Sequence, residues 1–137
     1  MRNHETAMLA YARLARLSHD RKQPVGRDRF LVLTGREACF SGWIDVAARC
    51  RELVLANNPQ HLLSHDATFP EALREPDNGK FFAKLEAFCP FEQAEHLLHA
   101  SDDWPELSDN QTAGEFAFAQ LSVMAIPNDS ARGQGDR

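Results

Sequence analysis

The sequence predicts an all-α protein, a compact bundle of five to seven helices built on helical hairpins. Apolar residues recur at helical spacing along most of the chain. Proline, glycine and asparagine divide it into segments of helical length. Residues 116–118 alternate between phenylalanine and alanine as a strand would. An isolated strand would have no pairing partner, so a short helix is expected there.

The first expected element is a helix from Glu5 to Ser18. Its apolar side is narrow and comprises Met8, Tyr11, Ala12, Leu14 and Ala15. Residues 19–28 follow as a linker closed by Pro24 and Gly26. Asp28 is expected to cap the next helix, since an aspartate carboxylate accepts hydrogen bonds from the free N–H groups of a first turn.

Residues 28–59 are expected to form a helical hairpin. The first helix, residues 30–40, carries apolar side chains on two sides, which predicts that it packs between neighbours at the centre of the fold. Ser41-Gly42 is a turn signal. The second helix runs from Trp43 to Asn58-Pro59, because the residue before a proline avoids the α region.

One continuous helix over residues 29–57 is the alternative to this hairpin. It would place Gly35 and Gly42 in a helix interior, where each costs roughly 1 kcal/mol relative to alanine. The hairpin is therefore favoured.

The positions of glycine, alanine and proline in residues 28–59 resemble those of one tetratricopeptide repeat. Such a repeat spans about 34 residues, with glycine in its first helix, alanine in its second and proline at its end. Gly35, Ala47 and Pro59 stand at these places. Thr34, Ala38 and Arg51 depart from the pattern, which usually has leucine, tyrosine and another aromatic residue there. The resemblance implies a TPR-like scaffold that binds a peptide or protein without catalysis.

An ordinary helical hairpin is the other interpretation of the same residues. Gly35, Gly42 and Ala47 would then be the small side chains that a close helix crossing needs.

The second half of the chain predicts further short helices. Residues 60–66 form a helical turn or loop, and Thr68 begins a capping-box pattern for a helix that ends near Arg74. A turn at residues 76–79 leads to a helix that ends at Phe88, with Phe81 and Leu85 in line with it. Pro90 then starts a new helix over residues 90–100 at an angle to the last, followed by an acidic loop. One domain over residues 4–125 and a disordered tail over 126–137 are expected.

Composition excludes several classes of protein. No apolar run reaches about 18 residues, so no membrane span is expected. Arg13 and Arg16 interrupt the apolar core that a signal peptide would need, and a cytoplasmic location is therefore expected. Cys39, Cys50 and Cys89 match no disulfide or metal framework and read as structural thiols. No phosphate-binding, dinucleotide-binding or hydrolase motif is present, which predicts a non-catalytic protein without a cofactor.

Charge is spread unevenly over a chain of net charge −5. Residues 1–36 hold eight Lys or Arg against three Asp or Glu, whereas seven acids and no Lys or Arg lie between Glu92 and Glu115. A basic arm can bind nucleic acid, and its candidate residues are Arg13, Arg16, Arg21, Lys22, Arg27 and Arg29. The acidic total disfavours that interpretation. The alternative is that the basic N-terminal helix faces the acidic C-terminal half, or an acidic partner.

The strongest candidates for chemistry are Glu92, Glu95, His96 and His99, which share one face of the helix 90–100. Carboxylate and imidazole groups on one face are ligands for a transition metal. The spacing is Glu-x-x-x-His rather than the Glu-x-x-His of di-metal bundles, and no second helix supplies a matching pair. The alternative is two i,i+4 pairs on a solvated face.

His61 and His65 are also one helical turn apart. They could complete a four-histidine site with His96 and His99 if the two segments met, which is the weaker form of the metal hypothesis.

The chain is therefore expected to bind another protein or a peptide, or to form its own oligomer. A small helical metal-binding protein that uses the Glu/His face is the alternative. Nucleic-acid association through the basic arm is the least favoured.

Overall fold

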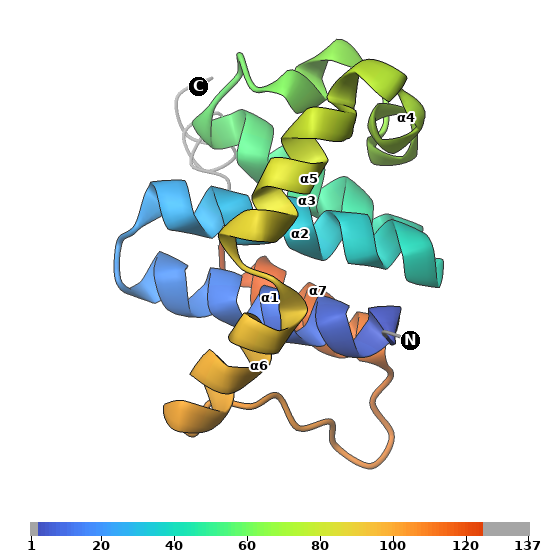
Figure 1. Ribbon diagram of the computed structural model, residues 1–137. Helices are drawn as coiled ribbons and strands as arrows, with labels where there is room; N and C mark the ends of the chain where they lie inside the picture. Colours follow the sequence, from blue (N-terminus) through green and yellow to red (C-terminus); the bar gives the residue numbers. More distant parts are fainter. Residues whose placement is uncertain (1–2, 125–137) are drawn as a thin grey trace, which may run out of the picture.

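The computed structural model describes residues 3–124 of the chain. This part contains seven α-helices, two short 3-10 helices and no strand, which confirms the all-α class (Figure 1). In chain order the elements are α1 (His4–Asp20), α2 (Pro24–Ser41), α3 (Ile44–Asn57), η1 (Leu62–His65), α4 (Phe69–Arg74), η2 (Pro76–Asn78), α5 (Gly79–Phe88), α6 (Phe91–Ala100) and α7 (Ala113–Ser122). The predicted tail, residues 126–137, lies outside the described residues.

Helices α1 and α2 pack against each other as the central layer of the fold. Figure 1 shows α5 and α6 in front of this layer and α7 behind α1, and α3 packs on both α2 and α7. Every residue from Ala7 to Ala12 is buried, so the predicted narrow apolar side of α1 is wrong. The many alanines of this helix explain the difference, because small side chains let neighbours approach it from several sides.

The hairpin of α2 and α3 is confirmed, and the single continuous helix is wrong. Gly42 ends α2 in the left-handed region, with φ 85°, and its N–H bonds to the carbonyls of Ala38 and Cys39. Glycine is therefore needed at position 42 for the backbone conformation of this turn. It is not needed for a close helix crossing, since an added Cβ there would meet nothing within 4 Å.

Helix α2 begins earlier than the sequence predicts. Pro24 occupies its first turn, where a proline loses no hydrogen bond, and the linker shrinks to residues 21–23. Asp28 lies one turn inside α2, so its predicted capping role is wrong. Its carboxylate instead accepts hydrogen bonds from Arg27 at 3.0 Å and from the Asn57 amide at 2.7 Å.

Gly35 allows a close approach between α2 and α4. A Cβ at this position would lie 2.2 Å from the ring of Phe69, which is fully buried. The predicted Thr68 cap holds α4 in this place, because its hydroxyl accepts the N–H of Glu71 at 3.3 Å. Gly35 is therefore needed to make room for the Phe69 ring of α4, and not for the packing of α2 against α3 within the hairpin.

The break between α5 and α6 is fastened to the core. Pro90 is the cap residue of α6 and so stands just outside the predicted first turn. The buried hydroxyl of Tyr11 donates to the carbonyl of Cys89 at 2.8 Å. This bond ties the interruption directly to α1.

The last helix closes the back of the fold. A capping box at Thr112 and Glu115, which was not among the predicted caps, starts α7 and confirms a helix there. Arg13 of α1 bonds Asp103 at 3.0 Å, so one residue of the basic N-terminal helix meets the acidic C-terminal half. None of the helices formed by residues 3–124 has the length and apolar character to cross a bilayer.

Candidate functional site

A broad hollow on the described surface lies between α2 and α5. Two adjoining cavities of about 220 and 580 Å³ share Arg29, Phe81 and Leu85. Together they form a continuous depression, named here the α2–α5 groove. Its walls come from Val25, Arg29 and Val32 of α2 and from Phe81, Lys84, Leu85 and Phe88 of α5.

Helical spacing places these side chains on facing stripes. The α2 residues stand at i, i+4 and i+7, and the α5 residues at i, i+3, i+4 and i+7, so each set shares one face. The rings of Phe30 and Phe88 lie 5.7 Å apart across the two helices. Much apolar surface nevertheless stays open, since Val25 is 65% exposed and Phe88 is 39% exposed.

Positive charge borders the apolar floor of the groove. The guanidinium carbon of Arg29 lies 4.7 Å from the centroid of the Phe88 ring, a cation–π contact. Neither Arg29 nor Lys84 makes an ion pair within residues 3–124, whereas Asp28, the acid at the groove wall, is bonded to Arg27. The groove therefore offers apolar contact and two free cationic groups.

His61 stands where η1 meets the narrower end of the groove. Its Nδ1 accepts the N–H of Leu63 at 3.1 Å, and its ring meets Phe81 edge-on at 5.5 Å. Burial lowers the pKa of His61, and the nearby carboxylate of Asp28 opposes this shift. The imidazole is therefore neutral at pH 7, with its proton on Nε2.

The Glu/His face of α6 is present but is not gathered into a metal site. Glu92, His96 and His99 are exposed and Glu95 is half-buried. His99 stacks on Trp104, with ring centroids 4.5 Å apart and planes at 14°. In residues 3–124 no three His, Cys, Asp or Glu side chains come together as ligands for a metal ion. The metal hypothesis stays a prediction.

The basic residues of the N-terminal third do not act as one surface. Three of the six candidates form ion pairs: Arg13 with Asp103 at 3.0 Å, Arg16 with Asp20 at 3.2 Å and Arg27 with Asp28 at 3.0 Å. Arg21 and Lys22 are exposed at the end of α1, while Arg29 belongs to the groove. Nucleic-acid binding likewise stays a prediction.

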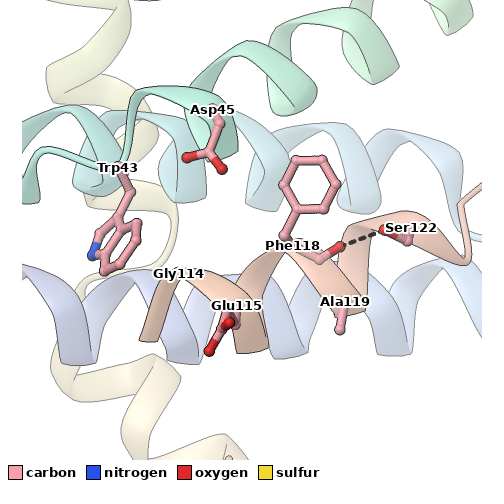
Figure 2. Close-up of a pocket in the computed structure, with 7 residues that line it drawn as sticks. All are labelled: Trp43, Asp45, Gly114, Glu115, Phe118, Ala119 and Ser122. Atoms are coloured by element: carbon pink, nitrogen blue, oxygen red, sulfur yellow. Dashed lines mark hydrogen bonds between the residues drawn. The ribbon is translucent and has the colours of Figure 1, made fainter. Parts of the chain in front are cut away.

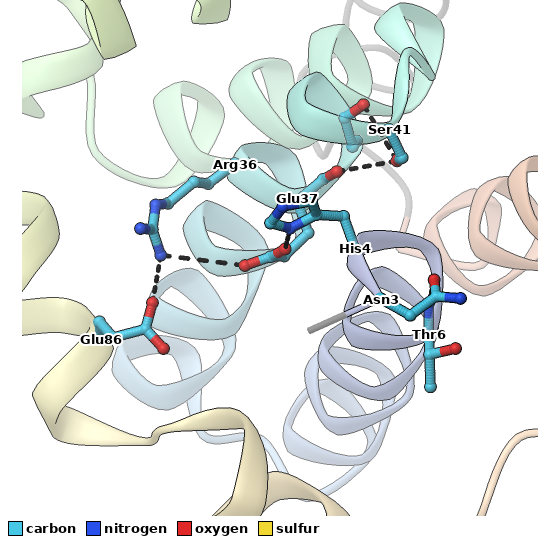
Figure 3. A network of polar contacts seen from close by, with 8 residues as sticks. Asn3, His4, Thr6, Arg36, Glu37, Ser41 and Glu86 are labelled. Atoms are coloured by element: carbon cyan, nitrogen blue, oxygen red, sulfur yellow. Dashed lines mark hydrogen bonds and ion pairs between the residues drawn. The ribbon is translucent and has the colours of Figure 1, made fainter. Parts of the chain in front are cut away.

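A buried carboxylate was not identified from the sequence. Glu37 of α2 is fully buried, and its carboxylate meets Nδ1 of His4 at 2.5 Å and a guanidinium nitrogen of Arg36 at 3.8 Å (Figure 3). Arg36 also pairs with Glu86 of α5. His4 of α1 and Arg36 of α2 thus meet this buried charge, and Arg36 extends the network to Glu86, which makes it a structural link among α1, α2 and α5.

The three cysteines have environments that oppose nucleophilic chemistry. Burial raises the pKa of the Cys39 and Cys89 thiols to about 11, and it raises that of Cys50 as well. A thiol attacks as its thiolate. The thiols at all three positions are protonated at pH 7.

A second pocket lies on the other side of the central layer, between α3 and α7. It has a volume of about 390 Å³ and is named here the α3–α7 pocket (Figure 2). Its lining comprises Trp43, Asp45, Gly114, Glu115, Phe118, Ala119 and Ser122. The Trp43 ring packs so closely on Gly114 that an added Cβ would lie 2.2 Å away, and its Nε1–H donates to Glu5 at 2.7 Å.

The groove had one signal in the sequence. Phe81, Leu85 and Phe88 were expected to pack as an apolar stripe, but of these Leu85 alone is buried. Phe82, outside that stripe, takes the inner position. A short helix with aromatic residues on more than one side has more apolar surface than one neighbouring helix can cover. That pattern in residues 81–88 is the sequence signal for an open apolar groove.

Comparisons of the chain with protein-family models, with curated proteins and with solved structures each find no match.

Proposed function

We propose that this chain is a non-catalytic interaction module, and that the α2–α5 groove binds a protein or peptide segment that combines apolar side chains with carboxylates. The observation that carries the proposal is the pairing of an open apolar floor with Arg29 and Lys84, both without an ion pair within residues 3–124. A cytoplasmic location is part of this proposal.

The energetics of such a complex follow from the two kinds of surface. Each aliphatic or aromatic anchor buried against Phe81 and Phe88 contributes about 1.5–3 kcal/mol. A carboxylate that reaches Arg29 can form two parallel hydrogen bonds with the planar guanidinium. The apolar contacts supply most of the affinity, and the charges select acidic over basic segments.

The likeness of residues 28–59 to a tetratricopeptide repeat supports the same proposal. That resemblance implies a scaffold that binds a peptide or protein, and in this chain the first helix of the hairpin, α2, lines the groove. Here α5, rather than a following repeat, supplies the opposite wall.

A pair of synthetic helical peptides tests the proposal. Both carry leucine and phenylalanine along one face; the first has glutamates on its flanks and the second has lysines. Fluorescence anisotropy should show that the acidic peptide binds and that affinity falls with added salt, as expected for partly exposed charges. The double variant Arg29→Glu with Lys84→Glu should weaken this binding by about tenfold or more.

A matched control separates the groove from net charge. Arg21 and Arg74 are exposed and do not line the groove, so Arg21→Glu with Arg74→Glu makes the same change in total charge. This control should bind the acidic peptide almost as wild type does. Equal losses in the two double variants, or no binding of the acidic peptide to wild type, would contradict the proposal.

A further inference from the structure

The α2–α5 groove and the α3–α7 pocket lie on opposite sides of the α1–α2 layer. Figure 1 shows α5, which bears the groove, in front of this layer, and Figure 2 shows α3 and α7 in front with α5 and α6 behind. The α7 face of one molecule therefore cannot reach the groove of that same molecule. Any contact between the two surfaces joins two copies of the chain.

The two surfaces have opposite charge. Asp45 and Glu115 line the α3–α7 pocket, and no Lys, Arg or His contributes to it. Asp45 makes no ion pair within residues 3–124, and Arg49, one turn further along α3, lies 3.6 Å from Glu52 instead. The groove, in contrast, carries Arg29 and Lys84.

The side chains of α7 also suit such a contact. Helix α7 contributes Glu115, Phe118, Ala119 and Ser122 to the lining of the shallow α3–α7 pocket, at i, i+3, i+4 and i+7, so they share one face of the helix. Phe118 is 37% exposed on this face and Glu115 lies one turn before it. A helix face with an exposed aromatic side chain and an acidic flank is the kind of ligand that an apolar groove with cationic walls accommodates.

We propose that the α7 face of one copy seats in the α2–α5 groove of a second copy, head to tail. This inference rests on the proposed function of the groove and names its occupant. Phe118 enters the wider, 580 Å³ part of the groove beside Phe88, and Glu115 and Asp45 face Arg29 and Lys84 of the other copy. Because the two surfaces lie on opposite sides of each molecule, the contact is heterologous and leads to open chains or to a ring.

Sedimentation velocity on the intact chain tests this arrangement. The wild type should grow beyond a dimer as its concentration rises, and added salt should reverse the growth. A groove variant, Arg29→Glu with Lys84→Glu, and a pocket variant, Asp45→Asn with Phe118→Ala, should each raise the concentration needed for association by about tenfold or more. All four positions are at least partly exposed, and thermal unfolding of each variant verifies that it is folded.

Mixing the two variants gives the decisive result. The intact pocket face of the groove variant can seat in the intact groove of the pocket variant, so the mixture should form dimers and nothing larger. The pocket variant carries neutral rather than basic replacements, so that it is not attracted to the acidic side chains introduced into the groove variant. A wild type that stays monomeric at hundreds of micromolar, or a mixture that stays monomeric, would overturn the inference.

The acidic helical peptide separates this inference from the proposed function. If the wild type stays monomeric but binds the peptide through Arg29 and Lys84, the groove is an interaction site and the head-to-tail contact is wrong. If the wild type neither associates nor binds the peptide, both proposals fail. If both are right, the peptide should compete with α7 and dissociate the chains.

Discussion

The guanidinium of Arg29 lies over the ring of Phe88, with its central carbon 4.7 Å from the ring centroid. This contact joins α2 to α5 at the wider part of the groove, where both side chains remain exposed, Phe88 by 39%. Arg29 thus has two roles, in packing and in charge, and they can be separated by substitution.

Arg29→Met should remove the charge but keep most of the aliphatic contact with Phe88. We expect the free energy of unfolding to fall by no more than about 1 kcal/mol, the range of an exposed cation–π contact. Binding of the acidic peptide should fall several-fold and lose part of its salt dependence. Chemical denaturation and anisotropy measure the two effects, and unchanged salt dependence would show that Arg29 does not meet the carboxylates.

Gly35→Ala should destabilise the fold. The new Cβ would lie 2.2 Å from the ring of Phe69, which is buried and also packs on Phe82, so the ring has little room to move. We expect a net loss of about 1–3 kcal/mol, as for other overpacked cores, despite the better helix propensity of alanine. Urea denaturation provides the measurement.

Two further variants check that explanation. Phe69→Leu combined with Gly35→Ala should cost less than the sum of the single substitutions, because the smaller side chain relieves the clash. Gly79→Ala, where an added Cβ meets nothing within 4 Å, should be neutral or stabilising by roughly 0.4–1 kcal/mol. Additive costs at positions 35 and 69 would mean that the two do not collide.

The ends of several helices could be predicted from the sequence, because each depends only on residues close by in the chain. The turn at Gly42 and the Thr68 cap depend on residues within one helical turn, and both are confirmed. The burial of α1 on nearly all sides could not be predicted, because alanine occurs both in cores and on surfaces of helices. Whether an alanine is buried depends on which other helices pack against it.

The groove illustrates the same limit. The periodicity of residues 81–88 predicts which side chains share a face but not whether another helix covers that face. Phe88, the last residue of α5, stays 39% exposed. Likewise Asp28 is of a residue type that often caps helices, but Pro24 starts α2 one turn earlier. The Asp28 carboxylate therefore lies beside Asn57 instead.

The stability of the fold should depend on pH through His61. Its pKa is lowered in the folded state, so the unfolded chain binds the proton more tightly. The contribution of this group is fully present above its ordinary value of 6.5 and is lost as the pH falls below it. The melting temperature of the wild type should therefore decrease on acidification through this window.

His61→Asn should remove that part of the pH dependence. Its side-chain oxygen can still accept the N–H of Leu63, so the cap of η1 is kept without a titrating group. A variant whose melting temperature falls with pH as steeply as that of the wild type would exclude His61 as the source.

The thiols should react slowly in the folded protein. With a pKa of about 11 at Cys39 and Cys89, the thiolate fraction at pH 8 is about one in a thousand. Labelling with Ellman's reagent should be slow under native conditions and rapid for all three residues in denaturant. A native thiol that reacts at the denatured rate would contradict the burial on which this prediction depends.

The location of binding is the central claim, and amide chemical-shift mapping tests it most directly. On titration of the isotope-labelled chain with the acidic helical peptide, the largest changes should fall on residues 25–32 and 81–88, the two walls of the groove, and should disappear in the Arg29→Glu, Lys84→Glu variant. Changes centred on α6, or spread evenly over the molecule, would contradict the account.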